Sequence, residues 1–93
     1  MDYGKAITII RSAKGLSQKD LALLIGKTPS YISRLEKNER TPSSTLVTDM
    51  CKKLGVPEEL FQLLATRYGH MDSQDKGLLE QFGAKLLKII TAG

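Results

Sequence analysis

The chain has 93 residues and a net charge of +4; apolar residues make up 41% of it and aromatic residues only 5%. This length fits one domain with one modest hydrophobic core, and a core of Leu and Ile without Trp is typical of packed helices. A single cysteine and a single histidine exclude an internal disulfide and argue against zinc, so we expect no metal and no cofactor. No segment approaches the roughly 20 apolar residues of a membrane span.

The positive charge is concentrated in the first part of the chain. Residues 1–40 contain eight Lys or Arg against four Asp or Glu, whereas residues 41–93 contain six of each kind. The excess suits a polyanionic partner for the first part, although ordinary solubilising charge explains it equally well.

Helix signals recur from the N-terminus onward. A first helix is expected from Tyr3 to Lys14, with apolar residues at helical spacing and a stop at Gly15. A capping-box pattern beginning at Ser17 opens a helix over 17–26, which ends at Gly26. Thr28 followed by a proline opens the next helix, over 28–38.

The second half continues in the same way. Ser43 or Ser44 can cap a helix that Gly55 closes, and Pro57 starts another. The apolar residues expected to face inward from this last helix are Leu60, Phe61, Leu63 and Leu64. Residues 68–71 are interpreted as a hinge, followed by a final amphipathic helix of about 18 residues.

These elements predict an all-α fold with two parts. Residues 1–67 would form a five-helix unit, and residues 68–93 a hinge and a C-terminal amphipathic helix. The helices over 17–26 and 28–38 are separated by only Lys27 and Thr28, with Gly26 allowing a sharp reversal. This pairing predicts a helix-turn-helix.

Residues 7–64 resemble the Cro/repressor-type helix-turn-helix family, also called the XRE family. The segments that carry the resemblance are Ile10-Arg11, Lys14-Gly15-Leu16-Ser17-Gln18, Leu21-Ala22, Ile25-Gly26, Ile32-Ser33-Arg34-Leu35-Glu36, Arg40-Thr41-Pro42-Ser43 and Leu54-Gly55-Val56. They occur in the order and spacing of the family, over about 60% of the chain. The resemblance implies double-stranded DNA as the partner and the helix over 28–38 as the one that enters the major groove.

The same resemblance implies which residues would contact bases. The candidates are Thr28, Pro29, Ser30, Ser33 and Arg34. Arg34 is the strongest of them, because a guanidinium can bond to O6 and N7 of one guanine together. A phosphate contact or a surface ion pair is its alternative role. Pro29 departs from the glutamine of well-known phage repressors and can offer only apolar contact.

Other residues would contact the sugar-phosphate backbone. Gln18 matches a family glutamine that holds a phosphate at a helix N-terminus, although it could also be a plain exposed residue. The remaining candidates are Tyr31, Lys37, Asn38, Arg40 and Ser43. Tyr31 could equally cover the edge of the core. Arg11 and Glu36 match a family pair that forms a structural salt bridge between helices.

The final helix carries an apolar stripe that must be buried. The stripe includes Leu79, Phe82, Leu86, Ile89 and Ile90. It could pack on its own domain or pair with a second chain, and the need for two half-sites favours a homodimer.

We therefore expect a cytoplasmic, bacterial or phage-encoded transcription regulator, a repressor reading a palindromic operator, with no enzyme activity. The alternatives are an antitoxin with a toxin partner and a protein-interaction module on the same scaffold.

Overall fold

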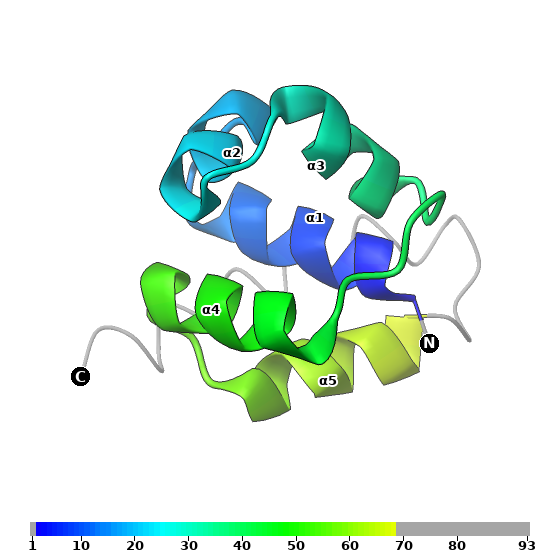
Figure 1. Cartoon of the computed structure of the whole chain (residues 1–93). Coiled ribbons are helices and arrows are strands. Elements are labelled where there is room, and N and C mark those ends of the chain that lie inside the picture. The colour runs from blue at the N-terminus through cyan, green and yellow to red at the C-terminus, as the bar shows by residue number, and fades with distance from the viewer. Residues whose placement is uncertain (1, 69–93) are drawn as a thin grey trace.

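The computed structural model describes residues 2–68 of the chain (Figure 1). They form α1 (Tyr3–Ala13), α2 (Gln18–Ile25), α3 (Pro29–Glu36), α4 (Ser44–Leu54) and α5 (Glu58–Tyr68). Every regular element in this stretch is a helix, so the expected all-α fold with a helix-turn-helix is confirmed. The expected hinge beyond Tyr68 and the C-terminal helix with its apolar stripe lie outside the described residues.

Side-chain caps fix where the first four helices begin. Asp2, Ser17, Thr28 and Ser43 each accept a hydrogen bond from the backbone N–H three residues further on. Each bond satisfies one of the N–H groups that a helix start leaves without a partner. Ser43, and not Ser44, is therefore the cap of α4.

Apart from the cap residues that the expected ranges include, three boundaries differ from the sequence-based expectation. α3 ends at Glu36, earlier than expected, because the chain turns at Asn38, whose φ of 61° is incompatible with a continuing helix. α5 begins at Glu58, with the carbonyl of Pro57 accepting from Leu60 N at 3.2 Å. Tyr68, expected in the hinge, is the last residue of α5.

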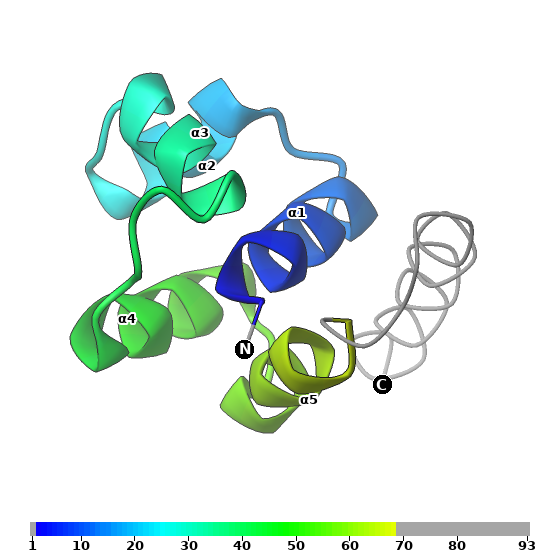
Figure 2. The ribbon, with the colours of Figure 1, turned by 90° about the vertical axis from the view of Figure 1, so that its right-hand side faces the viewer.

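The hydrophobic core surrounds α1. In Figures 1 and 2, α1 lies between the α2–α3 pair and the α4–α5 pair. Ile7 and Ile10 of α1 pack in one cluster with Ile32 of α3 and Phe61 of α5. Leu63 was wrongly expected to face inward: it is 45% exposed. The helical period places it on the side of α5 opposite the buried Leu60, Phe61, Leu64 and Ala65.

α1 and α3 meet at a contact that only glycine permits. A Cβ atom added to Gly4 would lie 2.4 Å from the carbonyl oxygen of Glu36 and 2.7 Å from that of Leu35. Both obstructing atoms belong to the backbone, so α3 would have to move to accommodate a side chain. Gly4 therefore fixes the distance of the C-terminal end of α3 from α1.

Candidate nucleic-acid interface

The turn between α2 and α3 positions the expected recognition helix. Gly26 caps α2 with φ 69°, in the left-handed region that glycine adopts without strain. Lys27 N then donates to the carbonyl of Ala22 at 2.8 Å, and Thr28 caps α3 through Tyr31 N at 3.1 Å. Pro29 occupies the first helical position, where its missing N–H costs nothing. These local bonds set the angle at which α3 leaves α2.

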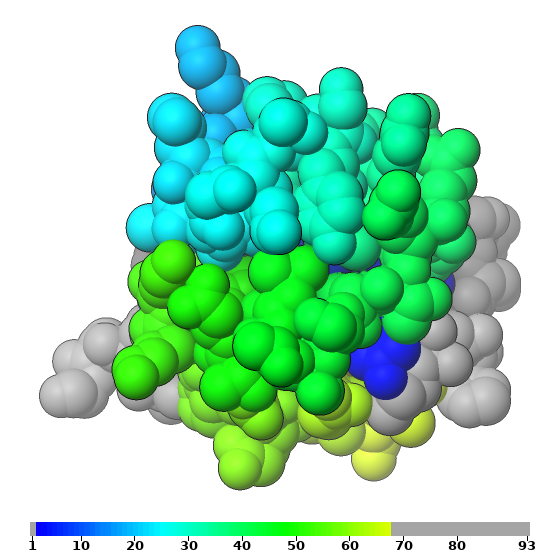
Figure 3. Space-filling view, viewed as in Figure 1, coloured from blue at the N-terminus to red at the C-terminus, as the bar shows by residue number. Residues whose placement is uncertain are grey.

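α3 buries one face and leaves the opposite face open to solvent. Ile32 and Leu35 are fully buried against α1 and α2. The expected base-reading residues lie away from them: Thr28, Pro29, Ser30 and Arg34 are exposed, and Ser33 is half-buried. Figure 3 shows residues of α2, α3 and α4 together on one face of the molecule. The five candidates therefore form one solvent-accessible stretch.

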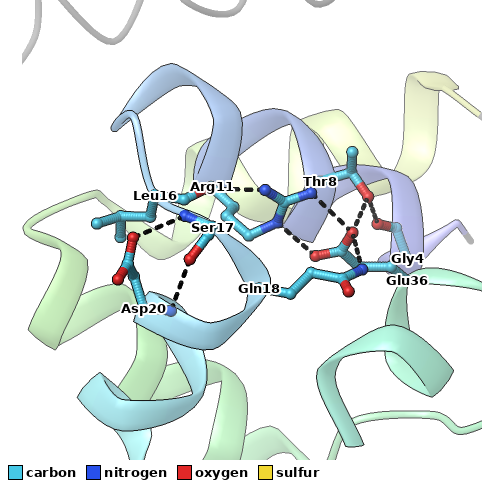
Figure 4. Close-up of polar contacts among 8 residues, drawn as sticks. All are labelled: Gly4, Thr8, Arg11, Leu16, Ser17, Gln18, Asp20 and Glu36. Carbon is cyan, nitrogen blue, oxygen red and sulfur yellow. Dashed lines mark hydrogen bonds and ion pairs between the residues drawn. The ribbon is translucent and has the colours of Figure 1, made fainter. Parts of the chain in front are cut away.

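An ion pair joins α1 to the end of α3 (Figure 4). Arg11 Nε donates to Glu36 Oε2 at 2.7 Å, and Arg11 Nη2 donates to Glu36 Oε1 at 3.1 Å. The side chains are only 16% and 8% exposed, respectively. Arg11 Nη1 also donates to the carbonyl of Leu16 at 2.8 Å, which ties the α1–α2 loop to the pair. Arg11 thus has the structural surroundings that the resemblance implied.

Two further side chains converge on the same carboxylate. Gln18 Nε2 donates to Glu36 Oε1 at 3.2 Å, and the Thr8 hydroxyl lies 3.1 Å from the same oxygen (Figure 4). Thr8 Oγ1 is also 2.9 Å from the carbonyl of Gly4, and its single proton serves both acceptors. Glu36 therefore holds Gln18, the first residue of α2, by its amide nitrogen. The Gln18 amide oxygen is not used in this bond.

Asn38 connects the loop after α3 to the start of α1. Its Oδ1 accepts from Gly4 N at 3.0 Å, and its Nδ2 donates to Asp2 Oδ1 at 2.8 Å. The same Asp2 oxygen accepts from Lys5 N at 2.9 Å as the cap of α1. The Asn38 side chain, expected on a DNA phosphate, is thus engaged within the protein.

The other expected phosphate contacts lie along both ends of α3. Lys37 and Arg40 are exposed, and Ser43 is exposed while capping α4. Tyr31 is half-buried and packs against the core, yet both Lys27 and Arg40 lie over its ring. The sequence analysis did not single out Lys27 as a candidate. Its position in the turn directly before the cap of α3 was the available signal.

Within residues 2–68, no group of three or more His, Cys, Asp or Glu side chains could hold a metal ion. No helix in the same stretch is long and apolar enough to cross a membrane.

The thiol of Cys51 is buried in the core, and its loss of solvation, reinforced by Glu58 and Glu59, raises its pKa to about 11.

Comparison with known proteins identifies a matching family and two similar proteins. The helix-turn-helix family matches residues 7–61. Multiprotein-bridging factor 1 from Debaryomyces hansenii is 39% identical over 56 residues, which are 60% of this chain but only 37% of that protein. The clp gene regulator ClgR from Corynebacterium glutamicum has a similar fold, with a TM-score of 0.67 and 24% identity over 99% of this chain and 93% of that one.

Proposed function

Because this chain belongs to the helix-turn-helix family, we propose that it is a sequence-specific DNA-binding transcription regulator that reads DNA through α3. The family membership inferred from the sequence is confirmed, and the reading of particular bases is the proposal. The observation that carries it is the exposed polar face of α3, which lies opposite the buried Ile32 and Leu35. A helix of this kind fits the major groove of B-DNA.

The roles proposed along α3 follow from side-chain chemistry. Arg34 bonds to a guanine in a bidentate manner, while Ser30, Ser33 and Thr28 add hydrogen bonds of lower specificity. Pro29 contributes apolar contact only. Lys37 and Arg40 neutralise phosphates, and the Gln18 amide group, whose nitrogen donates to Glu36, adds a further phosphate contact.

The bond to Glu36 defines how Gln18 would make its phosphate contact. A phosphate accepts hydrogen bonds, so the donor needed is the amide N–H₂ group, and one of its two protons is directed at Glu36. The second proton can still donate to a phosphate, and the Glu36 bond then fixes the direction of the side chain. We propose this second proton as the contact.

We further propose that the protein is a homodimer acting as a repressor on a palindromic operator. One recognition helix reads too few base pairs to select a site in a genome, and two helices on half-sites one turn apart overcome this limit. The apolar stripe of residues 79–90 is the proposed pairing surface. In this proposal, repression results from occupation of the operator.

The experiment is selection of bound duplexes from a random DNA pool with the full chain, followed by the same selection with Arg34→Ala. We expect a two-half-site consensus for the natural sequence and loss of preference at one position per half-site for R34A. The matched control is Arg67→Ala, an exposed arginine on α5, on the other side of α1 from α3. R67A should select the same consensus. Failure of the natural chain to enrich any sequence would contradict the proposal.

A protein-binding role is the second candidate. The relative from Debaryomyces hansenii is named a multiprotein-bridging factor, and the chain matches little more than a third of its length. In addition, Leu23 and Leu24 of α2 are 74% and 40% exposed. An antitoxin or bridging module would use such a surface. Absence of a DNA consensus, together with a protein complex lost on Leu23→Ser, would favour this candidate.

A further inference from the structure

Tyr31 brings together two cations from opposite ends of α3. Lys27 Nζ, from the turn before α3, lies over the Tyr31 ring at 5.4 Å from its centroid. Arg40 Cζ, from the loop after α3, lies over the same ring at 5.8 Å. Both distances are within the range of cation–π attraction. Since Tyr31 also packs against the core, the ring that holds the two cations is itself fixed.

The two cations lack an acidic partner in the described part of the chain. The ion pairs within residues 2–68 join Arg11 to Glu36 and Lys53 to Asp49, and neither involves Lys27 or Arg40. Two positive charges close to one ring repel each other, and the ring quadrupole offsets only part of that repulsion. An anion with charges spaced along it would satisfy both cations. The phosphate backbone of DNA has this character.

Tyr31 also lies in the right place relative to the base-reading residues. On the helical wheel of α3 it falls at the edge between the buried face and the exposed face that holds Ser30 and Arg34. When a recognition helix lies in the major groove, the sugar-phosphate backbone of the DNA runs along the edges of the helix face that points to the bases. The cations gathered there would therefore meet phosphates while Arg34 meets a base.

We propose that Tyr31 is a positioning residue whose ring holds Lys27 and Arg40 in place for phosphates of one DNA strand. This inference rests on the DNA-binding function proposed above. It adds Lys27 to the interface, and it assigns the role of Tyr31 to the ring instead of the hydroxyl. We call Lys27, Tyr31 and Arg40 the phosphate clamp.

The test measures binding of the full chain to a fluorescent duplex over a series of salt concentrations. The duplex can have any sequence, because phosphate contacts do not depend on sequence. Tyr31→Phe keeps the ring and should bind within about two-fold of the natural chain. Tyr31→Leu removes the ring and should bind about ten-fold more weakly, the combined effect of roughly two cation–π contacts. K27Q and R40Q should each reduce the slope of log affinity against log salt by about 0.9.

The decisive measurement is Y31L in the K27Q/R40Q background. The clamp predicts no further loss there, because the cations that the ring holds are gone. An equal loss in both backgrounds would show that Tyr31 acts through core packing, and a loss with Y31F as large as with Y31L would assign the contact to the hydroxyl. Either result overturns the clamp.

Two controls keep the outcome interpretable. If Y31L does not fold, as its thermal unfolding would show, Tyr31→Met replaces it in both backgrounds, because methionine keeps an apolar side chain without a ring. A loss with Y31M in the natural chain but not in the K27Q/R40Q background supports the clamp, and an equal loss in both overturns it. If the natural chain binds no duplex at any salt concentration, the proposed DNA-binding function fails as well. If the natural chain binds the duplex and the loss on removing the ring is equal in both backgrounds, the clamp is overturned and the proposed DNA binding stands.

Discussion

At the scale of single residues, Glu36 is the side chain on which most of the site depends. Its carboxylate receives hydrogen bonds from Arg11 of α1 and Gln18 of α2, while Glu36 itself closes α3. Three helices are thus joined at one group that is 8% exposed. A charge buried to this degree is stable only while its partners remain.

Replacing Glu36 by Gln should lower the free energy of unfolding by about 3 kcal/mol, because Arg11 then keeps a largely buried charge without its counter-charge. The measurement is urea unfolding followed by circular dichroism. Asp49→Asn is the matched control: its pair with Lys53 spans 3.2 Å but leaves both side chains over 40% exposed. Solvent screens such a pair, so D49N should cost less than about 1 kcal/mol. Equal losses would contradict the assigned role of Glu36.

At the scale of elements, α2 depends on a reciprocal cap at its start. Ser17 Oγ accepts from Asp20 N at 3.0 Å, and Asp20 Oδ2 accepts from Ser17 N at 3.0 Å. Hydrogen bonding to the carboxylate, first from the Ser17 backbone N–H and then from the Ser17 hydroxyl, holds the pKa of Asp20 below its ordinary value of 3.8. The cap of α2 is therefore sensitive to acid.

A carboxyl whose pKa is lower in the folded than in the unfolded chain stabilises the fold at any pH above its unfolded pKa. This stabilisation is lost as the pH falls through the folded pKa. The contribution of Asp20 to the free energy of unfolding should thus be complete at neutral pH and be lost as the pH falls below 3.8. An NMR titration of the Asp20 carboxyl checks the direction. Asp20→Asn should remove this part of the acid sensitivity and leave the remainder. A titration midpoint above 3.8 would refute the assignment.

The elements themselves were largely predictable, because their signals are local. The caps at Ser17 and Thr28 and the glycine ends at Gly26 and Gly55 each involve residues within four positions of one another. A short stretch of sequence therefore contains both partners. The position of Leu63 was not predictable from apolarity alone, since the burial of one face of α5 depends on α1.

The contacts that complete the site were harder to foresee for the same reason. Asn38 meets Gly4 across 34 positions and Gln18 meets Glu36 across 18. Such pairs depend on how the loops bring the helices together, so a local sequence pattern does not predict them. The Arg11–Glu36 pair was anticipated only through a family resemblance, and the cations over Tyr31 were not anticipated at all.

At the scale of the whole molecule, net charge and the proposed dimer symmetry would govern how the protein finds and holds DNA. The excess charge of +4 lies in residues 1–40, which include α2 and α3. This excess attracts a polyanion toward that part of the molecule. Each phosphate neutralised adds to the salt dependence of binding. A dimer doubles both the phosphate contacts and the bases read, so the proposed pairing through residues 79–90 determines whether the site is specific.

The pairing can be tested with two lysine substitutions on opposite sides of the predicted C-terminal helix. Leu86→Lys places a charge in the apolar stripe and should convert dimer to monomer in sedimentation velocity, because an unpaired charge cannot be buried between two apolar surfaces. Ala84→Lys adds the same charge about 160° away on the helical wheel and should leave the dimer intact. L86K should also bind a two-half-site operator no better than a single half-site. If L86K stays dimeric, or if the natural chain sediments as a monomer, the stripe is not the pairing surface.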